Sequence, residues 1–151
     1  MRMVIQRVLS CALKADGVPV DSMGQGLLVL VGIQPGDEEE AVMRYMLDKL
    51  VHLRIFEDEN GKMNLSVEDL GLDLFLVSNF TLYGDCRHGR RPSYSSGASP
   101  EEARTIYDAC VSYMKANTKV PVHTGVFQAY MDIETRLDGP VTLLLDSQKD
   151  F

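Results

Sequence analysis

One stretch of the sequence decides the fold class, Leu27-Leu28-Val29-Leu30-Val31-Gly32-Ile33. It carries no polar or charged side chain, so a strand built from it would present apolar residues on both faces. Such a strand is typical of the covered centre of a sheet. A second run, residues 74–82, begins with four apolar residues and then alternates. This pattern predicts a buried strand whose last residues emerge at an open edge or cleft.

Two helices are expected to cover this sheet. Asp37, with Glu40 three residues on, has the spacing of a capping box at the start of the first. Ser99 and Glu102 repeat that spacing around Pro100, which suits the first turn of the second helix. The residues expected to face the core recur at helical spacing: Val42, Met43, Met46, Leu47, Leu50 and Val51 in the first, and Ala103, Ile106, Tyr107, Cys110, Val111 and Met114 in the second.

The order of elements predicts an α/β fold in a single domain. Strands are expected at 2–13 and 18–23, then strand–helix twice, then about three strands between 120 and 145. This order favours a barrel-like, three-layer arrangement of mixed β-sheets with two covering helices. Residues 1–146 are expected to form the domain, and residues 147–151 a C-terminal tail.

The composition limits the range of functions. The formal net charge is −7 and the pI is about 4.9, which argue against a protein that coats nucleic acid non-specifically, and no DNA partner is expected. The densest positive cluster is Arg87-His88-Gly89-Arg90-Arg91, either a solvated loop or a local RNA contact.

The sequence has three cysteines, and this odd number argues against a disulfide framework. Cys11, Cys86 and Cys110 have neither redox nor metal-binding spacing, which favours a reducing cytoplasm. The first residues alternate instead of forming the apolar core of a signal peptide, and no run approaches membrane-spanning length. A cytoplasmic protein with no membrane partner is therefore expected.

Conventional catalytic motifs are missing from the sequence. The three histidines, His52, His88 and His123, lie in no Gly-x-Ser-x-Gly setting and show no metal-ligand spacing. Glycine-rich phosphate loops are absent as well. No metal and no cofactor are therefore expected. A Cys–His nucleophilic pair built on Cys86 or Cys110 stays open as an alternative.

Two short segments suggest a chemistry. Ser78-Asn79-Phe80-Thr81-Leu82 resembles the Ser-Gln-Phe-Thr-Leu segment of the D-aminoacyl-tRNA deacylase family, and Asp138-Gly139-Pro140-Val141-Thr142 resembles its second signature. Further segments align in the same order: 4–8, 54–56, 61–64, 83–85, 90–93, 97–100 and 123–125. Each segment is weak evidence alone, but the ordered combination, up to about residue 145, is specific.

The resemblance implies a homodimeric cytoplasmic enzyme that hydrolyses the ester joining a D-amino acid, or mischarged glycine, to the 3′ end of tRNA. In the family a cis Gly-Pro unit from one subunit enters the active site of the other and rejects L-amino acids, a role that would fall to Gly139 and Pro140. From the residues alone, a hairpin turn there is the simpler interpretation. Arg7 resembles the family's arginine that orients this Gly-Pro unit. Alternatively, Arg7 is a strand residue whose apolar stem is buried while its charged end reaches solvent.

The remaining site residues follow from the same resemblance. Ser78, Asn79, Phe80 and Thr81 would form the catalytic segment, with backbone N–H groups near Phe80 and Thr81 stabilising the oxyanion. Candidates for binding tRNA or its terminal adenosine are His123, Thr124, Gly125 and Phe127. Arg87, Arg90 and Arg91 are added because their positive charges would offset the repulsion between tRNA and an acidic protein.

Two positions depart from the family pattern. Asn79 stands where the family usually has Gln, and Gln128 where it commonly has Gly. Both put rate and substrate preference in question. Two alternatives stay open. One is a non-catalytic protein of the same fold that binds tRNA ends or an aminoacyl ligand, with Asn79 marking lost activity. The other is a deacylase with relaxed chirality, which would follow if the Gly139–Pro140 bond were trans.

Overall fold

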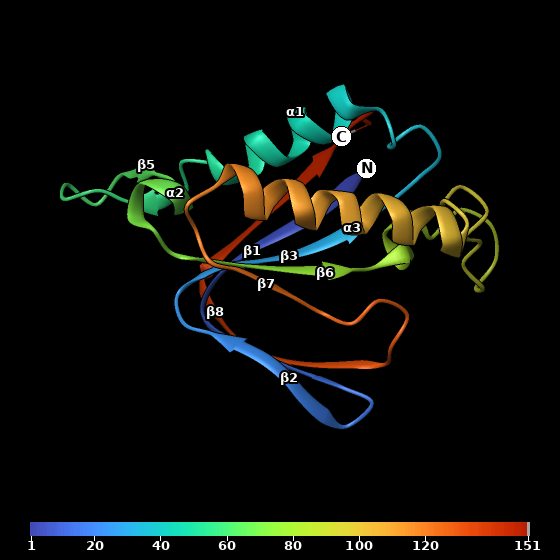
Figure 1. The fold of residues 1–151 in the computed structure, drawn as a ribbon, viewed down its shortest axis with the longest axis horizontal. Coiled ribbons are helices and arrows are strands. Elements are labelled where there is room, and N and C mark those ends of the chain that lie inside the picture. The colour runs from blue at the N-terminus through green and yellow to red at the C-terminus, as the bar shows by residue number, and fades with distance from the viewer. Residues whose placement is uncertain (151) are drawn as a thin grey trace.

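The computed structural model describes residues 1–150, which form a mixture of strands and helices (Figure 1). The strands are β1 (Arg2–Ala15), β2 (Val18–Met23), β3 (Gly26–Gly32), β4 (Phe56–Glu57), β5 (Met63–Leu65), β6 (Asp73–Ser78), β7 (Val122–Thr124) and β8 (Met131–Asp146). The helices are α1 (Glu40–Val51), α2 (Val67–Leu70), the 3₁₀ helix η1 (Phe80–Tyr83) and α3 (Pro100–Asn117).

The main sheet is built around β1 and β3. Its strand order is β2-β1-β3-β6-β7, and β8 pairs with the other edge of β1. The first half of β1 pairs with β3, whereas its second half pairs with β2. Because one strand belongs to both halves, the sheet bends over on itself, and β2 comes to contact β7 (Figure 1). The predicted barrel-like α/β fold is confirmed.

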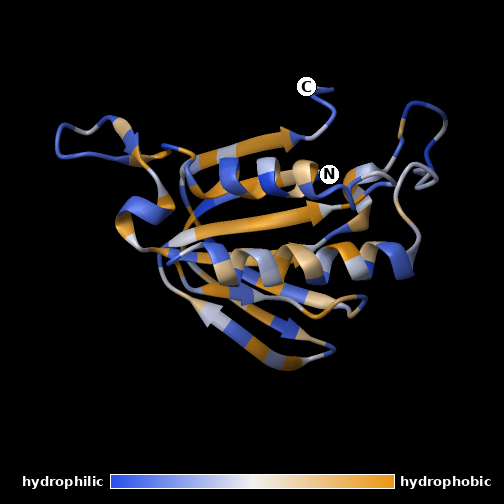
Figure 2. Cartoon of the chain, turned by 45° about the horizontal axis from the view of Figure 1, so that its top comes forward, coloured by the Kyte–Doolittle hydropathy of each residue, from blue (hydrophilic) through white to orange (hydrophobic). Residues whose placement is uncertain are grey.

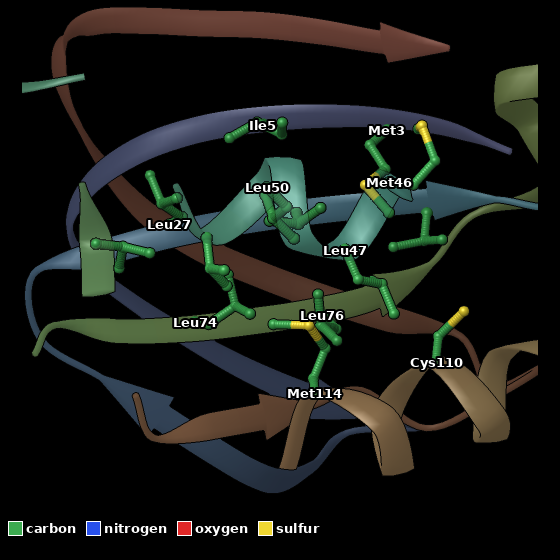
Figure 3. Packing of buried hydrophobic residues seen from close by; sticks show 14 of the residues in the cluster. Met3, Ile5, Leu27, Met46, Leu47, Leu50, Leu74, Leu76, Cys110 and Met114 are labelled. Carbon is green, nitrogen blue, oxygen red and sulfur yellow. The ribbon is translucent and has the colours of Figure 1, made fainter. Parts of the chain in front are cut away.

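The long helices α1 and α3 lie over the same face of this sheet (Figures 1 and 2). Leu27, Leu74 and Leu76 point from β3 and β6 toward Leu50 and Met114 of the helices and form the larger core (Figure 3). The alternate residues of the same strands form a second core inside the bent sheet, with members that include Leu28, Phe75 and Val77. These two cores explain why β3 and β6 are apolar on both faces.

Helix α3 begins as the sequence predicts. The Ser99 hydroxyl accepts a hydrogen bond from the Glu102 N–H at 3.3 Å, and the Ser99 N–H donates back to the Glu102 carboxylate. The expected capping role of Asp37 is wrong. Helix α1 begins three residues later, and the buried Asp37 carboxylate instead binds the Met1 ammonium group and the Gln34 N–H. A buried charge needs an opposite charge as its partner. Here the partner is the N-terminal ammonium group, which directly precedes β1.

Three further elements differ from the sequence expectation. The strand expected over 74–82 ends at Ser78, because the chain turns there into η1. The short hairpin β4–β5 and helix α2 stand between the two main strand–helix units. The last two of the expected strands are one continuous strand, β8, which pairs along both halves of β1.

The two ends of the chain lie together. The Ser147 N–H donates to the Met1 carbonyl at 2.9 Å, and Arg2 bonds Asp146 at 2.7 Å and Asp150 at 3.0 Å. The expected tail therefore contacts β1 over its described part, while Phe151 lies outside the described residues. Among residues 1–150, no helix combines the length and the apolar character needed to cross a bilayer.

Candidate active site

A cavity of about 650 Å³ opens where β3 and β6 end. Its walls come from these strand ends, η1, the start of α3, the turn before β8 and the first part of β8. The lining residues are Leu30, Val77, Ser78, Asn79, Phe80, Tyr94, Ala98, Pro100, Ala103, Gln128, Ala129, Met131 and Ile133. The carboxyl ends of parallel strands are a common position for ligand sites in α/β sheets, and the volume suits a small-molecule site.

The turn from β6 into η1 is organised by Asn79. Its backbone N–H donates to the Val31 carbonyl at 2.8 Å, which ties the turn to β3. Its side-chain Oδ1 accepts from the Thr81 N–H at 3.2 Å and from the Thr81 hydroxyl at 2.5 Å. The amide oxygen of Asn79 therefore caps η1 and is already occupied.

Because of this capping, the backbone N–H groups of Phe80 and Thr81 differ in whether they are free to bind a ligand. The Thr81 N–H is engaged by Asn79, whereas the Phe80 N–H donates to no group of residues 1–150. The Phe80 N–H is thus the better of the two expected oxyanion donors. The Thr81 hydroxyl gives its proton to an amide oxygen, which is not a base, so nothing in its contacts activates it as a nucleophile.

An aromatic pair forms the rim of the cavity. Phe80 leaves 63% of its surface exposed, and its ring meets that of Tyr94 edge to face with centroids 5.0 Å apart. Tyr94 comes from the loop between η1 and α3, which is held by the Ala98 N–H bond to the Ile33 carbonyl at 3.0 Å. An exposed aromatic surface at the mouth of a cavity can stack on a planar ligand.

The basic cluster occupies the tip of the same loop. Paired backbone bonds between Asp85 and Ser93, at 2.7 and 3.0 Å, close the base of this tip. The Arg87 guanidinium binds the Asp85 carboxylate at 2.7 Å and lowers the pKa of that carboxyl to about 2. Within residues 1–150 Arg90 and Arg91 form no ion pair, and both are exposed, so their charges face solvent.

The other expected binding residues do not line the cavity. The His123 Nδ1–H donates to the Asp21 carboxylate at 2.8 Å, and the imidazole ring stacks on Phe75. Thr124 follows it at the end of β7, and Gly125 binds the Leu76 carbonyl through its N–H at 3.0 Å. These residues hold the segment that leads to Gln128, but none of them lines the cavity.

Phe127 also turns away. Its ring packs against Tyr107 of α3, and the Arg104 guanidinium lies 4.8 Å from its centroid. The cavity wall is made instead by Ala129, Met131 and Ile133, which sequence reasoning did not single out. The alternation of β8 was the available signal, because Met131 and Ile133 are part-buried while their neighbours are exposed.

The second signature segment projects from β8. In the β1–β8 register Gln6 faces Thr142 and Val8 faces Leu137, so residues 138–141 stand opposite Arg7 alone. The segment is therefore a large bulge within one strand pair and not the end of a hairpin. Its Gly139–Pro140 peptide bond is cis, and both residues are exposed.

Arg7 holds this bulge from beneath. Only 6% of the residue is exposed, and Nη1 donates to the Ile55 carbonyl at 2.6 Å. Nε lies 3.0 Å from Asp138 Oδ2, an ion pair without hydrogen-bond alignment. Gly139 has φ +117°, and a Cβ there would lie 2.8 Å from the Val141 nitrogen, so glycine is required at this position.

The two signature segments are separated within one chain. Arg7 faces Leu27 on β3, whereas Asn79 binds Val31 on the same strand. Four strand residues correspond to about 13 Å. The bulge at Gly139 is therefore at the opposite end of β3 from the cavity.

No thiol lines the cavity. Cys11 and Cys110 are buried, and burial raises the pKa of the first to about 11 and of the second to about 12. Cys86 is exposed on the basic loop. Within residues 1–150, no three side chains of His, Cys, Asp or Glu gather as metal ligands.

Comparisons with known proteins agree with this geometry. The sequence model described as D-Tyr-tRNA(Tyr) deacylase matches residues 4–146. Proteins named D-aminoacyl-tRNA deacylase from Halothermothrix orenii and Clostridioides difficile are each 52% identical to the chain, with full coverage of both partners.

Solved structures show the same fold. One titled c-Myc DNA Unwinding Element Binding Protein superposes with a TM-score of 0.90 at 31% identity, covering 97% of this chain and 98% of that one. A probable eukaryotic D-amino acid tRNA deacylase superposes with a TM-score of 0.80 at 16% identity, covering 95% and 97%. The second likeness concerns the fold alone. On the family match and the full-length relatives, the chain belongs to the D-Tyr-tRNA(Tyr) deacylase family.

Proposed function

We propose that this protein hydrolyses the ester that joins a D-amino acid to the 3′-terminal adenosine of tRNA, releasing the free amino acid and the tRNA. The observation that carries this proposal is the family match over residues 4–146, which includes the segment that builds the cavity, Ser78 to Thr81. Mischarged glycyl-tRNA is a second substrate of the same site, because glycine lacks the side chain on which chiral rejection depends.

The chemistry requires little from side chains. A water oxygen bonds to the ester carbonyl carbon, and the bond to the ribose oxygen breaks. The departing ribose oxygen takes the proton that the water gives up, and the neighbouring ribose hydroxyl assists this transfer. The Phe80 N–H, which has no partner among residues 1–150, is the candidate oxyanion donor. One such donor contributes about 3 kcal/mol in other acyl-transfer enzymes. Ser78 and Phe80 shape the walls.

Chiral selection is assigned to the Gly139–Pro140 segment of a second subunit. The distance of about 13 Å along β3 supports this arrangement, because the segment lies away from the cavity of its own chain. Its exposed position at the top of the β8 bulge leaves it available to a partner. There its carbonyl oxygens would receive the substrate's amino group and Cα hydrogen, so an L side chain would clash while a D side chain points away. Selection then acts by exclusion.

Deacylation of D-Tyr-tRNA and L-Tyr-tRNA by the purified protein tests this function. We expect rapid hydrolysis of the D-ester only, and loss of activity or of chiral selection in a Gly139→Ala, Pro140→Ala variant. Equal hydrolysis of both esters by the native protein would support relaxed chirality instead. If tRNA bound without hydrolysis of either ester, the protein would be a non-catalytic binder.

A Cys–His hydrolase would be inactivated by thiol alkylation, whereas the proposed mechanism uses no thiol and should be unaffected. Cys110 is buried among the residues of the larger core, and burial raises the pKa of its thiol to about 12, so little reactive thiolate is present at neutral pH. Treatment with iodoacetamide should modify the exposed Cys86 and leave deacylation unchanged. Inactivation that follows the extent of alkylation would favour the Cys–His alternative.

A further inference from the structure

Gln128 has an unusual backbone conformation at the edge of the cavity. Its φ of +64° lies in the left-handed region, which Asp16, Gln128 and Lys149 alone among the non-glycine residues of the described chain adopt. Asp16 lies in the β1–β2 turn and Lys149 beyond β8, so Gln128 is the one that lines the cavity. A glutamine in this conformation has an energetic cost, and such outliers often lie at functional sites.

The carboxamide of Gln128 has hydrogen-bonding capacity that Asn79 lacks. Both side chains line the cavity, but Asn79 Oδ1 already accepts two hydrogen bonds from Thr81. No hydrogen bond joins the Gln128 side chain to any other part of residues 1–150. The cavity therefore presents one glutamine whose donor and acceptor are both available to a ligand.

The neighbouring groups indicate the class of ligand. Phe80 and Tyr94 offer an exposed aromatic surface on the same cavity, which suits stacking of a nucleobase. A carboxamide matches the adenine edge, because its oxygen accepts from the N6 amino group while its nitrogen donates to N7. Guanine and hypoxanthine carry an oxygen at position 6, which would face the carboxamide oxygen instead.

We propose that Gln128 is a specificity-determining residue that recognises the adenine base of the substrate's terminal nucleotide through its N6 and N7 atoms. The inference rests on the proposed function, since it assigns the base-recognising group of the same cavity. It concerns binding of the base and not the chemical step. Its failure and that of deacylation are therefore separable.

The test is binding of two non-hydrolysable probes, 3′-deoxy-3′-(D-tyrosylamino)adenosine and its inosine counterpart, by calorimetry. The native protein should prefer the adenosine probe by about tenfold, a typical value for one base-recognising pair. Gln128→Gly should reduce this preference to about twofold or less. Because glycine adopts positive φ without strain, the same variant should keep or raise the melting temperature.

Gln128→Ala is the matched control. Alanine also removes the carboxamide but retains the backbone strain, so this variant should lose the adenine preference and melt at or below the temperature of Gln128→Gly. An adenine preference that survives in both variants, or that is absent from the native protein, would overturn the proposal. D-Tyr-tRNA deacylation measured in parallel reports on the proposed function independently, because probe binding needs no turnover.

Discussion

Replacing Arg7 by methionine should destabilise the protein and disturb the bulge at Gly139 together. The change removes a guanidinium that is almost fully buried, while leaving a stem of similar length. It would leave the Ile55 carbonyl without its 2.6 Å bond and the Asp138 carboxylate without its partner at 3.0 Å. Breaking a buried ion pair from one side costs about 3–5 kcal/mol.

The cost here is lower because the Asp138 side chain is 26% exposed and water can replace part of the lost interaction. We therefore expect Arg7→Met to lower the free energy of unfolding by about 2–3 kcal/mol. For a domain of this size that corresponds to a fall in melting temperature of about 4–12 °C. Deacylation of D-Tyr-tRNA should fall as well, because the bulge loses its anchor.

Urea unfolding of Arg7→Met, Asp138→Asn and the double variant, at one protein concentration, measures the coupling between the two side chains. A coupling energy of about 1–2 kcal/mol is expected. Arg7→Lys is the control, since it keeps the charge but cannot reach Ile55 and Asp138 through the same planar group. A coupling below about 0.3 kcal/mol would refute the anchoring role, whatever the single variants do.

Three further predictions concern other parts of the molecule. Burial raises the pKa of the Asp146 carboxyl, but the hydrogen bond from Arg2 outweighs this effect and holds the pKa below its usual value. Its contribution to stability is therefore present above about pH 4 and lost as the pH falls through the lowered pKa, so Asp146→Asn should flatten the acid limb of a stability–pH curve. Asn79→Ala should remove the η1 cap, lower stability by about 1 kcal/mol and reduce the deacylation rate, whereas Asn79→Asp keeps an acceptor and should retain stability. Changing Arg90 and Arg91 to alanine should lower the slope of log K against log salt for tRNA binding by about 1.4–1.8, and the carboxylate-paired Arg87 should contribute less; equal slopes for all variants would exclude the loop from the tRNA contact.

The apolar pattern was sufficient to predict the layers of the fold. Leu27 to Val31 alternate between two cores, and only a strand covered on both sides can bury all of them. The capping box at Ser99 was equally local, because its two partners, Ser99 and Glu102, are only three positions apart in the sequence. Asp37 has the same local pattern, but a buried ammonium group 36 residues away competes for its carboxylate, which no local rule can include.

The candidate site, like the fold, was only partly predictable from the sequence. The sequence by itself points to the segments Ser78 to Thr81 and Asp138 to Thr142 as the proposed site, because an ordered set of short motifs spans the chain. Only the tertiary structure decided which side chains surround the cavity: it brings Gln128 and Met131 to the wall and turns His123 and Phe127 away. The physical reason is that side-chain direction in a bent sheet depends on register and curvature, which are set by packing between strands distant in sequence. Short motifs point to candidate residues, while long-range packing determines what those residues face.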